Sequence, residues 1–454
     1  MVKKIVIQLF LSIVLSVSAI GQQPRILITT DIGGDPDDRQ SLIRLMVYTN
    51  EFDIEGIISS AAGIPGELGR DVIYPEAIEE IIYGYAQVFP NLTKHDKNYP
   101  APERLLSVVK RGNPQRGCTH VGEGKDTEGS EWIIRMAYKN DKRPLNICIF
   151  GGQTDLAQAL WKVKNNRTKR EYQKFISRIR VYDIMDQDHI FEKIINEHPT
   201  LFYILSKAPE EQEGNDGWDG IYRGMFLGGD ESLTSLQWLK ENVIEEHGVL
   251  GAMYPTKTWT APNPYGALKE GDTPSWFFFL KNGLNYPEHP EYGGWGGRYK
   301  KNDAGYYSDV TVPGEKNANA TISRWRDDFQ RDFAARMDWS VRDYSTANHA
   351  PLVSVNRFSK REALIIRVKS GRMIDFDASE TKDPDGNLLR FEWMLYPEAG
   401  NFEGQAQLES NGSKTSLIMP KLNSGVSLHI ILKVTDNGIP ALTSYKRIIL
   451  TNKK

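Results

Sequence analysis

Apolar and polar positions follow two rhythms in the first 345 residues. Short apolar runs, which predict buried strands, alternate with longer segments whose apolar residues recur every three or four positions, which predicts helices. The predicted strands cover residues 25–30, 54–61, 144–150 and 177–184, and the predicted helices cover residues 37–50, 75–88 and 154–163. This alternation implies right-handed crossovers. We therefore expect an α/β domain over residues 22–345, with a mostly parallel sheet flanked by helices in a Rossmann-like arrangement.

Beyond residue 345 the pattern changes to short alternating segments separated by turns rich in Asp, Gly and Pro. Seven such segments lie between residues 349 and 451, and each is short enough to be a strand with one solvated face. This spacing is typical of an all-β immunoglobulin-like sandwich, which we expect over residues 346–454.

The chain begins with Lys3 and Lys4, followed by a short apolar stretch and then small residues. This order is typical of a secretory signal peptide, which we expect over residues 1–21. No later run of about 18 apolar residues follows, so we expect no membrane insertion. The sequence therefore predicts a periplasmic or secreted protein.

Charge and cysteine content exclude several other classes. The formal net charge of −3 gives no electrostatic reason to expect nucleic acid as a partner. The two cysteines, Cys118 and Cys148, exclude a disulfide framework and a Cys-rich metal site. A single bond between them suits an oxidising compartment, whereas the apolar run around Cys148 favours a buried free thiol. The sequence leaves that pairing and the oligomeric state open.

The stretch TTDIGGDPDDRQ, residues 29–40, directly follows the first predicted strand and carries Asp31, Asp35, Asp37 and Asp38. Carboxylates this close repel one another unless a cation or a proton neutralises them. Helix capping would explain one aspartate at the start of the next helix, but not four. Because Ca²⁺ takes many oxygen ligands, we expect a metal site at the carboxyl end of this strand.

Residues 274–299 combine many aromatic side chains with glycines. Aromatic rings on glycine-rich loops suit stacking on the faces of sugar rings. Such rings also serve as core anchors for long irregular loops. Both interpretations stay open at this point.

Four stretches in order along the chain resemble the inosine–uridine-preferring nucleoside hydrolases. They are TTDIGGDPDD at residues 29–38, EFDIEGIISSAAG at 51–63, IFGGQTDLAQAL at 149–160 and EGDTPSW at 270–276. The first stretch is about two residues longer than the family's pattern. This longer form, together with an immunoglobulin-like C-terminal domain, is similar to a diverged branch described as cellulose-binding nucleoside-hydrolase-like proteins.

The resemblance implies a Ca²⁺ ion held by Asp31, Asp38, the backbone carbonyl of Thr154 and Asp272. Asp37 would then be the catalytic general base, which takes a proton from a calcium-bound water. That water would attack the anomeric carbon of a sugar through an oxocarbenium-like state. The implied reaction is hydrolysis of a glycosidic bond.

The match departs from the family at the groups that contact ribose and base. The second strand lacks the asparagine that binds ribose, and Gly271 stands where typical members carry a histidine. The two extra residues also leave Asp35 as a competitor for the role of base or ligand. Candidates for substrate binding or for a substitute acid are Asp35, Asp186, Asp188, Glu270, His289, Trp295 and Arg298.

Two functional hypotheses follow from these observations. The leading one is a secreted, calcium-dependent hydrolase of N-glycosyl or related sugar bonds, acting on a small molecule or an oligosaccharide. The alternative is a non-catalytic protein on the same scaffold that binds cellulose or another plant glycan. The full acidic set favours the hydrolase, because a binding protein has no need of a water-activating base.

Overall fold

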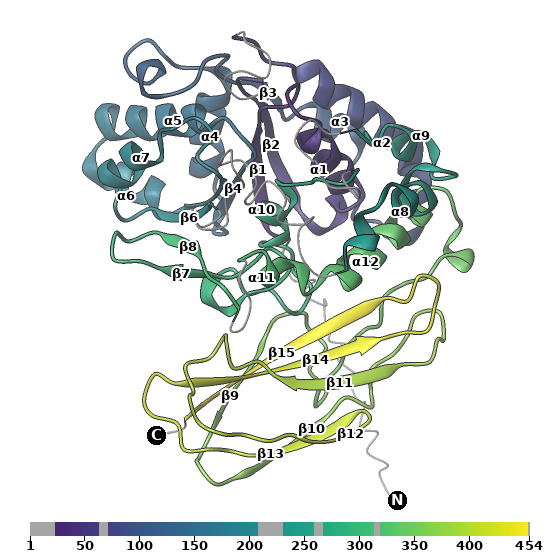
Figure 1. Cartoon of the computed structure of the whole chain (residues 1–454). Coiled ribbons are helices and arrows are strands. Elements are labelled where there is room, and N and C mark those ends of the chain that lie inside the picture. The colour runs from purple at the N-terminus through teal and green to yellow at the C-terminus, as the bar shows by residue number, and fades with distance from the viewer. Residues whose placement is uncertain (1–22, 63–70, 208–229, 258–266, 313–317, 453–454) are drawn as a thin grey trace, which may run out of the picture.

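The computed structural model describes residues 23–62, 71–207, 230–257, 267–312 and 318–452. The predicted signal peptide at residues 1–21 lies outside the described residues. Figure 1 shows an α/β part with the strands of a sandwich packed beneath it. The domain boundary expected at residue 345 falls within a short 3-10 helix, η8 (Tyr344–Thr346), that follows the last long helix of the α/β part.

An eight-stranded sheet runs through the α/β part in the order β3-β2-β1-β4-β5-β6-β8-β7. Neighbouring strands are parallel except for β7 and β8. The strands are β1 (Arg25–Thr30), β2 (Asp53–Ser59), β3 (Val109–Arg111), β4 (Leu145–Ile149), β5 (Ile179–Ile184), β6 (Phe202–Ser206), β7 (Tyr299–Lys301) and β8 (Tyr307–Asp309). The predicted mostly parallel sheet is confirmed.

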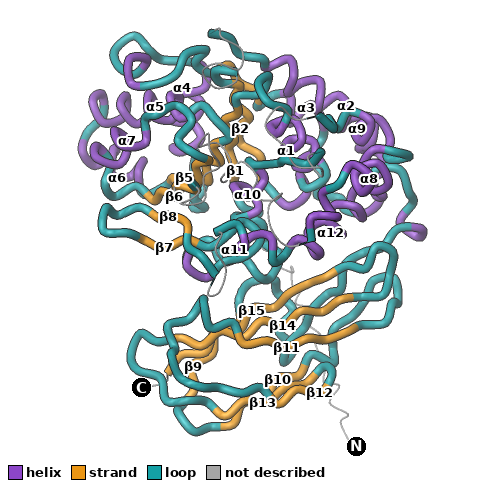
Figure 2. The backbone as a smooth tube through the Cα atoms, in the orientation of Figure 1, coloured by secondary structure: helices purple, strands orange, loops and turns teal. Residues whose placement is uncertain are grey.

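Helices cover both faces of this sheet, as Figure 2 shows. They are α1 (Asp37–Met46), α2 (Pro75–His95), α3 (Pro102–Leu106), α4 (Glu128–Tyr138), α5 (Gln153–Asn166), α6 (Lys169–Ile176), α7 (Phe191–Glu197), α8 (Leu236–Leu239), α9 (Gly248–Ala252), α10 (Thr273–Phe277), α11 (Ala320–Ser323) and α12 (Arg326–Trp339). Side chains alternate across a strand, so Ile26 and Ile28 of β1 join the core beneath α1 and α2, and Leu27 joins the core beneath α4 to α7.

The C-terminal part consists of two facing sheets. One has the order β10-β13-β12 and the other has the order β11-β14-β15-β9. Their strands are β9 (Leu364–Val368), β10 (Met373–Asp377), β11 (Arg390–Leu395), β12 (Glu409–Asn411), β13 (Lys414–Ile418), β14 (Ser427–Thr435) and β15 (Thr443–Asn452). The predicted all-β sandwich is confirmed. Its predicted first strand, residues 349–356, is wrong: this segment links the two parts and pairs only through isolated bridges at Leu352 and Val355.

The sandwich packs directly onto the α/β part. Tyr396, Ile431 and Tyr445 belong to the same buried apolar cluster as the helices α1, α2 and α12. The buried guanidinium of Arg447 donates hydrogen bonds to the carbonyl oxygens of Leu284 at 2.7 Å and Gly293 at 2.9 Å. One buried apolar cluster therefore spans both parts, although the sandwich also has a core of its own.

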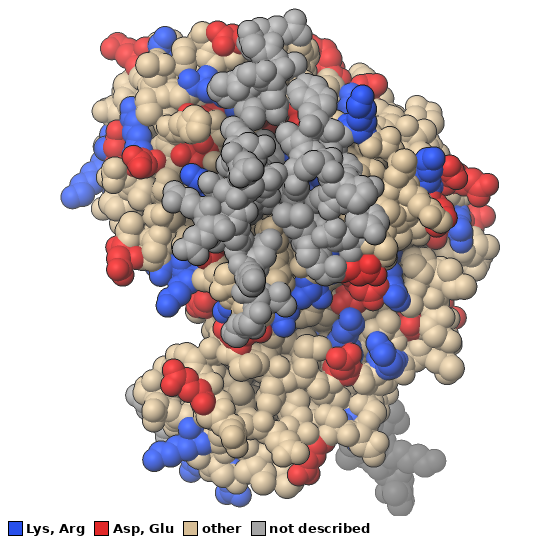
Figure 3. Space-filling model, viewed as in Figure 1, with Lys and Arg blue, Asp and Glu red and all other residues tan. Residues whose placement is uncertain are grey.

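Other observations bear on location and surface chemistry. Among the described residues, none of the helices combines the length and apolar character needed to cross a membrane. Cys118 is exposed, Cys148 is buried, and the two are not bonded to each other. On the face shown in Figure 3, basic and acidic side chains are interspersed.

Candidate functional site

The candidate site lies where the chain order of the sheet reverses. From the central strand β1, the chain continues to β2 on one side, whereas β4 lies on the other side. Ligands of parallel α/β sheets bind at the carboxyl ends of strands at such a switch point. Asp31 follows β1 and Gly151 follows β4. Any side chain at Gly151 would collide with the Asp31 carboxylate, so the two loops lie in contact there.

Three buried carboxylates converge at this position. One oxygen each of Asp37, Asp38 and Asp272 lies within 4.8 Å of the other two. Asp37 and Asp38 form the first turn of α1, but the helix has no side-chain capping hydrogen bond. Asp272 is only 2% exposed, and its Oδ2 has no hydrogen-bond partner. Capping therefore does not account for this cluster, and the buried Oδ2 of Asp272 is an oxygen with the chemistry of a cation ligand.

The Asp272 segment is held against α1 by one amide side chain. Gln40 of α1 accepts a hydrogen bond from the backbone N–H of Lys269 at 2.9 Å. The same side chain donates to the carbonyl oxygen of Ala267 at 2.6 Å. Asp272 does not follow a strand. It stands immediately before the short helix α10.

Burial and mutual repulsion shift the titration of these carboxyls. Burial raises the pKa of Asp38 well above its usual range, and the charges of Asp31, Asp272 and Asp37 raise it further. Burial followed by the charges of Asp37 and Asp31 likewise raises the pKa of Asp272. The pKa of Asp31 is raised by burial, although the Arg116 charge opposes this shift. Among the described residues, the positive charge near these carboxyls does not offset their burial and mutual repulsion.

Two cationic side chains of the chain itself enter the cluster. Lys269 is fully buried; its ammonium group forms an ion pair with Asp35 and lies 3.6 Å from a carboxylate oxygen of Asp37. Arg116 forms an ion pair of 2.8 Å with Asp31. Asp31, Asp35, Asp37, Asp38 and Asp272 thus face Lys269 and Arg116. When all are ionised, the described part of the cluster retains a surplus of three negative charges.

Thr154 and Asp188 join the same network through Arg116. The backbone N–H and the hydroxyl of Thr154 donate to Asp188 at 2.8 and 2.6 Å. The second nitrogen of the Arg116 fork lies 3.7 Å from the other Asp188 oxygen. The structure therefore brings Asp31, Thr154 and Asp188 together, although they come from three different strand ends.

Asp186 lies in a strained loop beside this network. Met185, Asp186 and His189 have φ angles of 72°, 53° and 53°, in the left-handed region that such residues rarely adopt. The side-chain amide of Gln153 donates to Asp186 at 2.9 Å and to buried Asp183 at 2.7 Å. Strain of this kind clusters at functional sites, where the surrounding contacts fix the loop.

Glu270 was expected in the substrate cleft, but the structure gives it a buried partner. Its carboxylate forms a fully buried ion pair of 2.6 Å with Arg44. It also accepts hydrogen bonds from the hydroxyls of Tyr254 at 2.5 Å and Thr273 at 2.9 Å. Since these partners neutralise and satisfy it, Glu270 acts as a structural anchor of its segment.

Trp295, Arg298 and His289 do not lie at the acidic cluster, so the expectation that they line the substrate cleft is corrected. Trp295 is 3% exposed and packs between the two parts of the molecule, with its indole N–H 3.3 Å from the Tyr445 hydroxyl. Arg298 donates to the carbonyl oxygen of Glu398 at 3.0 Å, again across the domain junction. His289 is 45% exposed and pairs with Glu291.

Arg116, Lys269 and Asp183 belong to the site although the sequence did not predict them there. Lys269 directly precedes Glu270, a candidate acid, so a basic residue at that position was a usable signal. Arg116 follows β3, whose short, partly exposed sequence does not stand out as a strand. Asp183 is the penultimate residue of β5, where its burial could not be distinguished from exposure by periodicity alone.

Two family models match this chain. A family model described as "Cellulose-binding Sde182, nucleoside hydrolase-like domain" matches residues 25–299. A second model, "Cellulose-binding protein Sde0182, C-terminal domain", matches residues 373–452. No curated protein matches this chain.

The solved structures include a full-length likeness. A nucleoside hydrolase-related protein from Saccharophagus degradans, described as associated with carbohydrate metabolism, is 32% identical to this chain. The match covers 95% of this chain and 100% of that one, with a TM-score of 0.81. Human CDH23 EC21-23 is 19% identical over 23% of this chain and 33% of its own, but its TM-score of 0.18 carries no argument. This chain therefore belongs to the family of cellulose-binding Sde182-type proteins with a nucleoside hydrolase-like domain.

Proposed function

We propose that this protein is a secreted or periplasmic, calcium-dependent hydrolase of glycosidic bonds, N-glycosyl or related, with a carbohydrate-containing substrate. The observation that carries the proposal is the unsatisfied Oδ2 of Asp272, buried beside Asp37 and Asp38 in a cluster whose described residues carry surplus negative charge. Maintaining this arrangement is costly unless a cation completes it. The signal-like segment at residues 1–21 supports export.

The donor set suits a hard divalent cation. Asp31, Asp38, Asp272 and the carbonyl of Thr154 would hold Ca²⁺, since all four offer oxygen, and the set contains neither sulfur nor imidazole. When bound, the ion would acidify a water molecule and draw it towards the sugar.

Asp37 is the residue best suited to receive the proton of that water. It belongs to the cluster, and one of its carboxylate oxygens lies 3.6 Å from the Lys269 ammonium. A carboxylate held in this way beside the proposed ion is placed to accept a proton from a bound water. Asp35 is bound to Lys269, so in this proposal it positions the lysine instead of competing for the base role. Asp186 and Asp188, on the strained loop, would contact the sugar hydroxyls.

A second candidate function is carbohydrate binding without catalysis. It is favoured by Lys269 and Arg116, which already neutralise part of the cluster from within the chain. The family's description as cellulose-binding supports a glycan ligand in either case.

The test is a screen of nucleosides and neutral oligosaccharides for released sugar, with Ca²⁺ and with a chelator. We expect turnover only with Ca²⁺, and a loss of about 100-fold or more in kcat for Asp37→Asn. Asp327→Asn, an exposed carboxylate on α12, is the matched control and should leave turnover unchanged. Full activity of Asp37→Asn, or full activity after chelation, would contradict the proposal. Binding of oligosaccharides with no turnover by the parent protein would establish the second candidate.

A further inference from the structure

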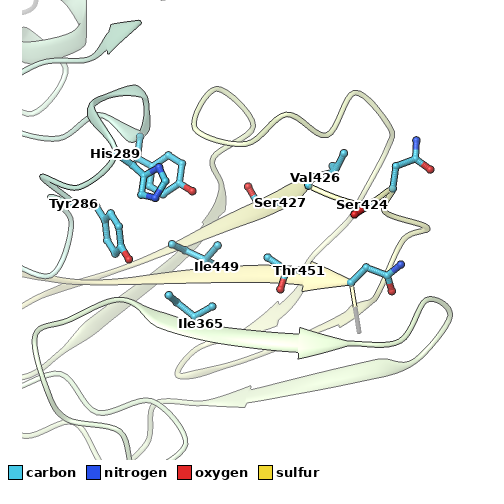
Figure 4. A pocket seen from close by; sticks show the side chains of 12 residues that line it. Tyr286, His289, Ile365, Ser424, Val426, Ser427, Ile449 and Thr451 are labelled. Atoms are coloured by element: carbon cyan, nitrogen blue, oxygen red, sulfur yellow. The ribbon is translucent and has the colours of Figure 1, made fainter. Parts of the chain in front are cut away.

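A groove lies at the junction of the two parts and shares no lining residue with the acidic cluster. Its volume is about 300 Å³, at the small end of the range for ligand pockets. Figure 4 shows Tyr286 and His289 on the loop of the α/β part facing Ile365, Ile449 and Thr451 of the sandwich. The groove therefore exists only when both parts are assembled.

One end of the groove is aromatic. The rings of His289 and Tyr292 stack with centroids 4.5 Å apart at an angle of 9°, and the ring of Tyr286 lies 5.4 Å from each of them. Tyr292 is itself braced by an edge contact of 4.3 Å with buried His429. Tyr286, His289 and Tyr292 are the aromatic residues of segment 274–299 that line this groove, whereas Trp295 is 3% exposed and serves as a core anchor.

The floor of the groove is apolar. Ile365 of β9 and Ile449 of β15 are paired across neighbouring strands, so their side chains lie on the same face of the sheet. Ile365 is 54% exposed, an unusual fraction for a large aliphatic side chain in a regular strand. Because β9 is an edge strand of its sheet, the groove is open along that side.

The other end offers neutral polar groups. Hydroxyl and amide side chains line it, from Ser424, Ser427, Thr451, Asn423 and Asn452. No Asp, Glu, Lys or Arg belongs to the described lining of this groove. An uncharged lining complements an uncharged ligand, because a charged ligand would lose hydration here without gaining a counter-charge.

We propose that this groove binds an uncharged β-linked glucan chain of the cello-oligosaccharide type. In such a chain all ring hydroxyls are equatorial, so each sugar presents apolar C–H faces and a polar edge. The faces suit the aromatic rings and the isoleucine floor, and the edges suit the amides and hydroxyls. The inference rests on the carbohydrate part of the proposed function and assigns it a second site that holds the polymer.

The test is calorimetric titration of the full chain with cellohexaose and, separately, with a charged oligogalacturonide of similar length. We expect cellohexaose to bind and the charged chain to bind at least tenfold more weakly. Tyr286→Ala should weaken cellohexaose binding about tenfold, since it removes one stacking ring. Tyr83→Ala, an exposed tyrosine on α2 outside the groove, is the matched control and should bind as the parent does.

The Asp37→Asn variant should bind cellohexaose like the parent protein. Its binding therefore tests this inference independently of whether the proposed catalysis is correct. The Tyr286→Ala variant should keep parental turnover of the small substrates found in the screen, and its circular dichroism melt shows whether it is folded. Ile365→Ser supplies a second groove variant with the same expected loss of binding. Equal binding of both oligosaccharides, or unchanged cellohexaose binding in both groove variants, would overturn the inference.

Discussion

At Lys269 a buried ammonium group lies between the carboxylates of Asp35 and Asp37. The aspartates of residues 29–40 were predictable from the sequence, because they follow a strand and are adjacent to one another. Their cationic partners were not predictable, since Asp35 and Lys269 are 234 positions apart and no local pattern links them. Charge compensation between distant loops depends on how the loops fold, which periodicity does not report.

Replacing Lys269 with Met should show how much of the repulsion among the clustered carboxylates the lysine ammonium relieves. Removing one partner of a buried ion pair costs about 3 kcal/mol of unfolding free energy, because the carboxylates stay buried without compensation. Ca²⁺ should restore more stability to this variant than to the parent. Urea unfolding with millimolar Ca²⁺ and with chelator measures both effects.

The control for this experiment is Lys162→Met, which removes an exposed ammonium group paired with Asp126 and Glu131. Surface pairs of this kind contribute less than about 1 kcal/mol. A Lys269→Met protein as stable as the parent, with no added response to Ca²⁺, would contradict a role of Lys269 as an internal counter-ion.

At the scale of elements, hydrophobic periodicity predicted β1, β2, β4, β5, α1, α2 and α5 of the α/β part. It did not predict the short strands β3, β6, β7 and β8 or the other helices. Loops were not predictable in this way. The left-handed residues Met185 and Asp186 carry no sequence signal, because tertiary contacts impose their conformation. The segment 349–356 alternates like a strand but lacks a neighbouring strand along its length.

The loop before β7 approaches β15 so closely that only glycine fits at residue 283. Its φ is 85°, and a Cβ there would overlap the carbonyl oxygen of Tyr445. We expect Gly283→Ala to lower the free energy of unfolding by about 3 kcal/mol, through overlap and backbone strain together. Chemical denaturation measures the loss.

Gly371→Ala is the matched control for this substitution. Gly371 has a φ of 75° but no neighbouring atom within reach of an added Cβ. Only the backbone cost of about 1 kcal/mol should appear. If both variants lose the same unfolding free energy, the close approach of the loop to β15 does not contribute to the effect of Gly283→Ala.

At the scale of the whole molecule, the junction contains a buried imidazole, His429, which receives a hydrogen bond from Arg447 at 3.3 Å. Burial, reinforced by the Arg447 charge, lowers the pKa of His429 from 6.5 to about 3. Below pH 6.5 the unfolded chain therefore binds a proton at this imidazole, whereas the folded chain does not. The free energy of unfolding consequently falls as the pH falls from about 6.5 to about 3.

Between pH 7 and pH 5 this group alone should cost about 2 kcal/mol of unfolding free energy. His429→Gln keeps an acceptor for Arg447 without a titrating ring, so the drop in stability over this interval should shrink by that amount. Denaturant titrations at the two pH values measure it. The control is His120→Gln, which removes a partly exposed imidazole remote in sequence from His429. It should leave the drop in unfolding free energy between pH 7 and pH 5 unchanged. A His429→Gln protein with the parental drop would show that this ring does not titrate on unfolding.

Tyr396, Ile431 and Tyr445 of the sandwich complete the apolar cluster beneath α1 and α12. A chain truncated after residue 345 would consequently expose an incomplete apolar core to water instead of yielding a stable α/β domain. A chimera that takes this sandwich from a relative therefore also needs that relative's loop around Gly283. For the same reason, the C-terminal part cannot be fused to another protein as an independent carbohydrate-binding domain.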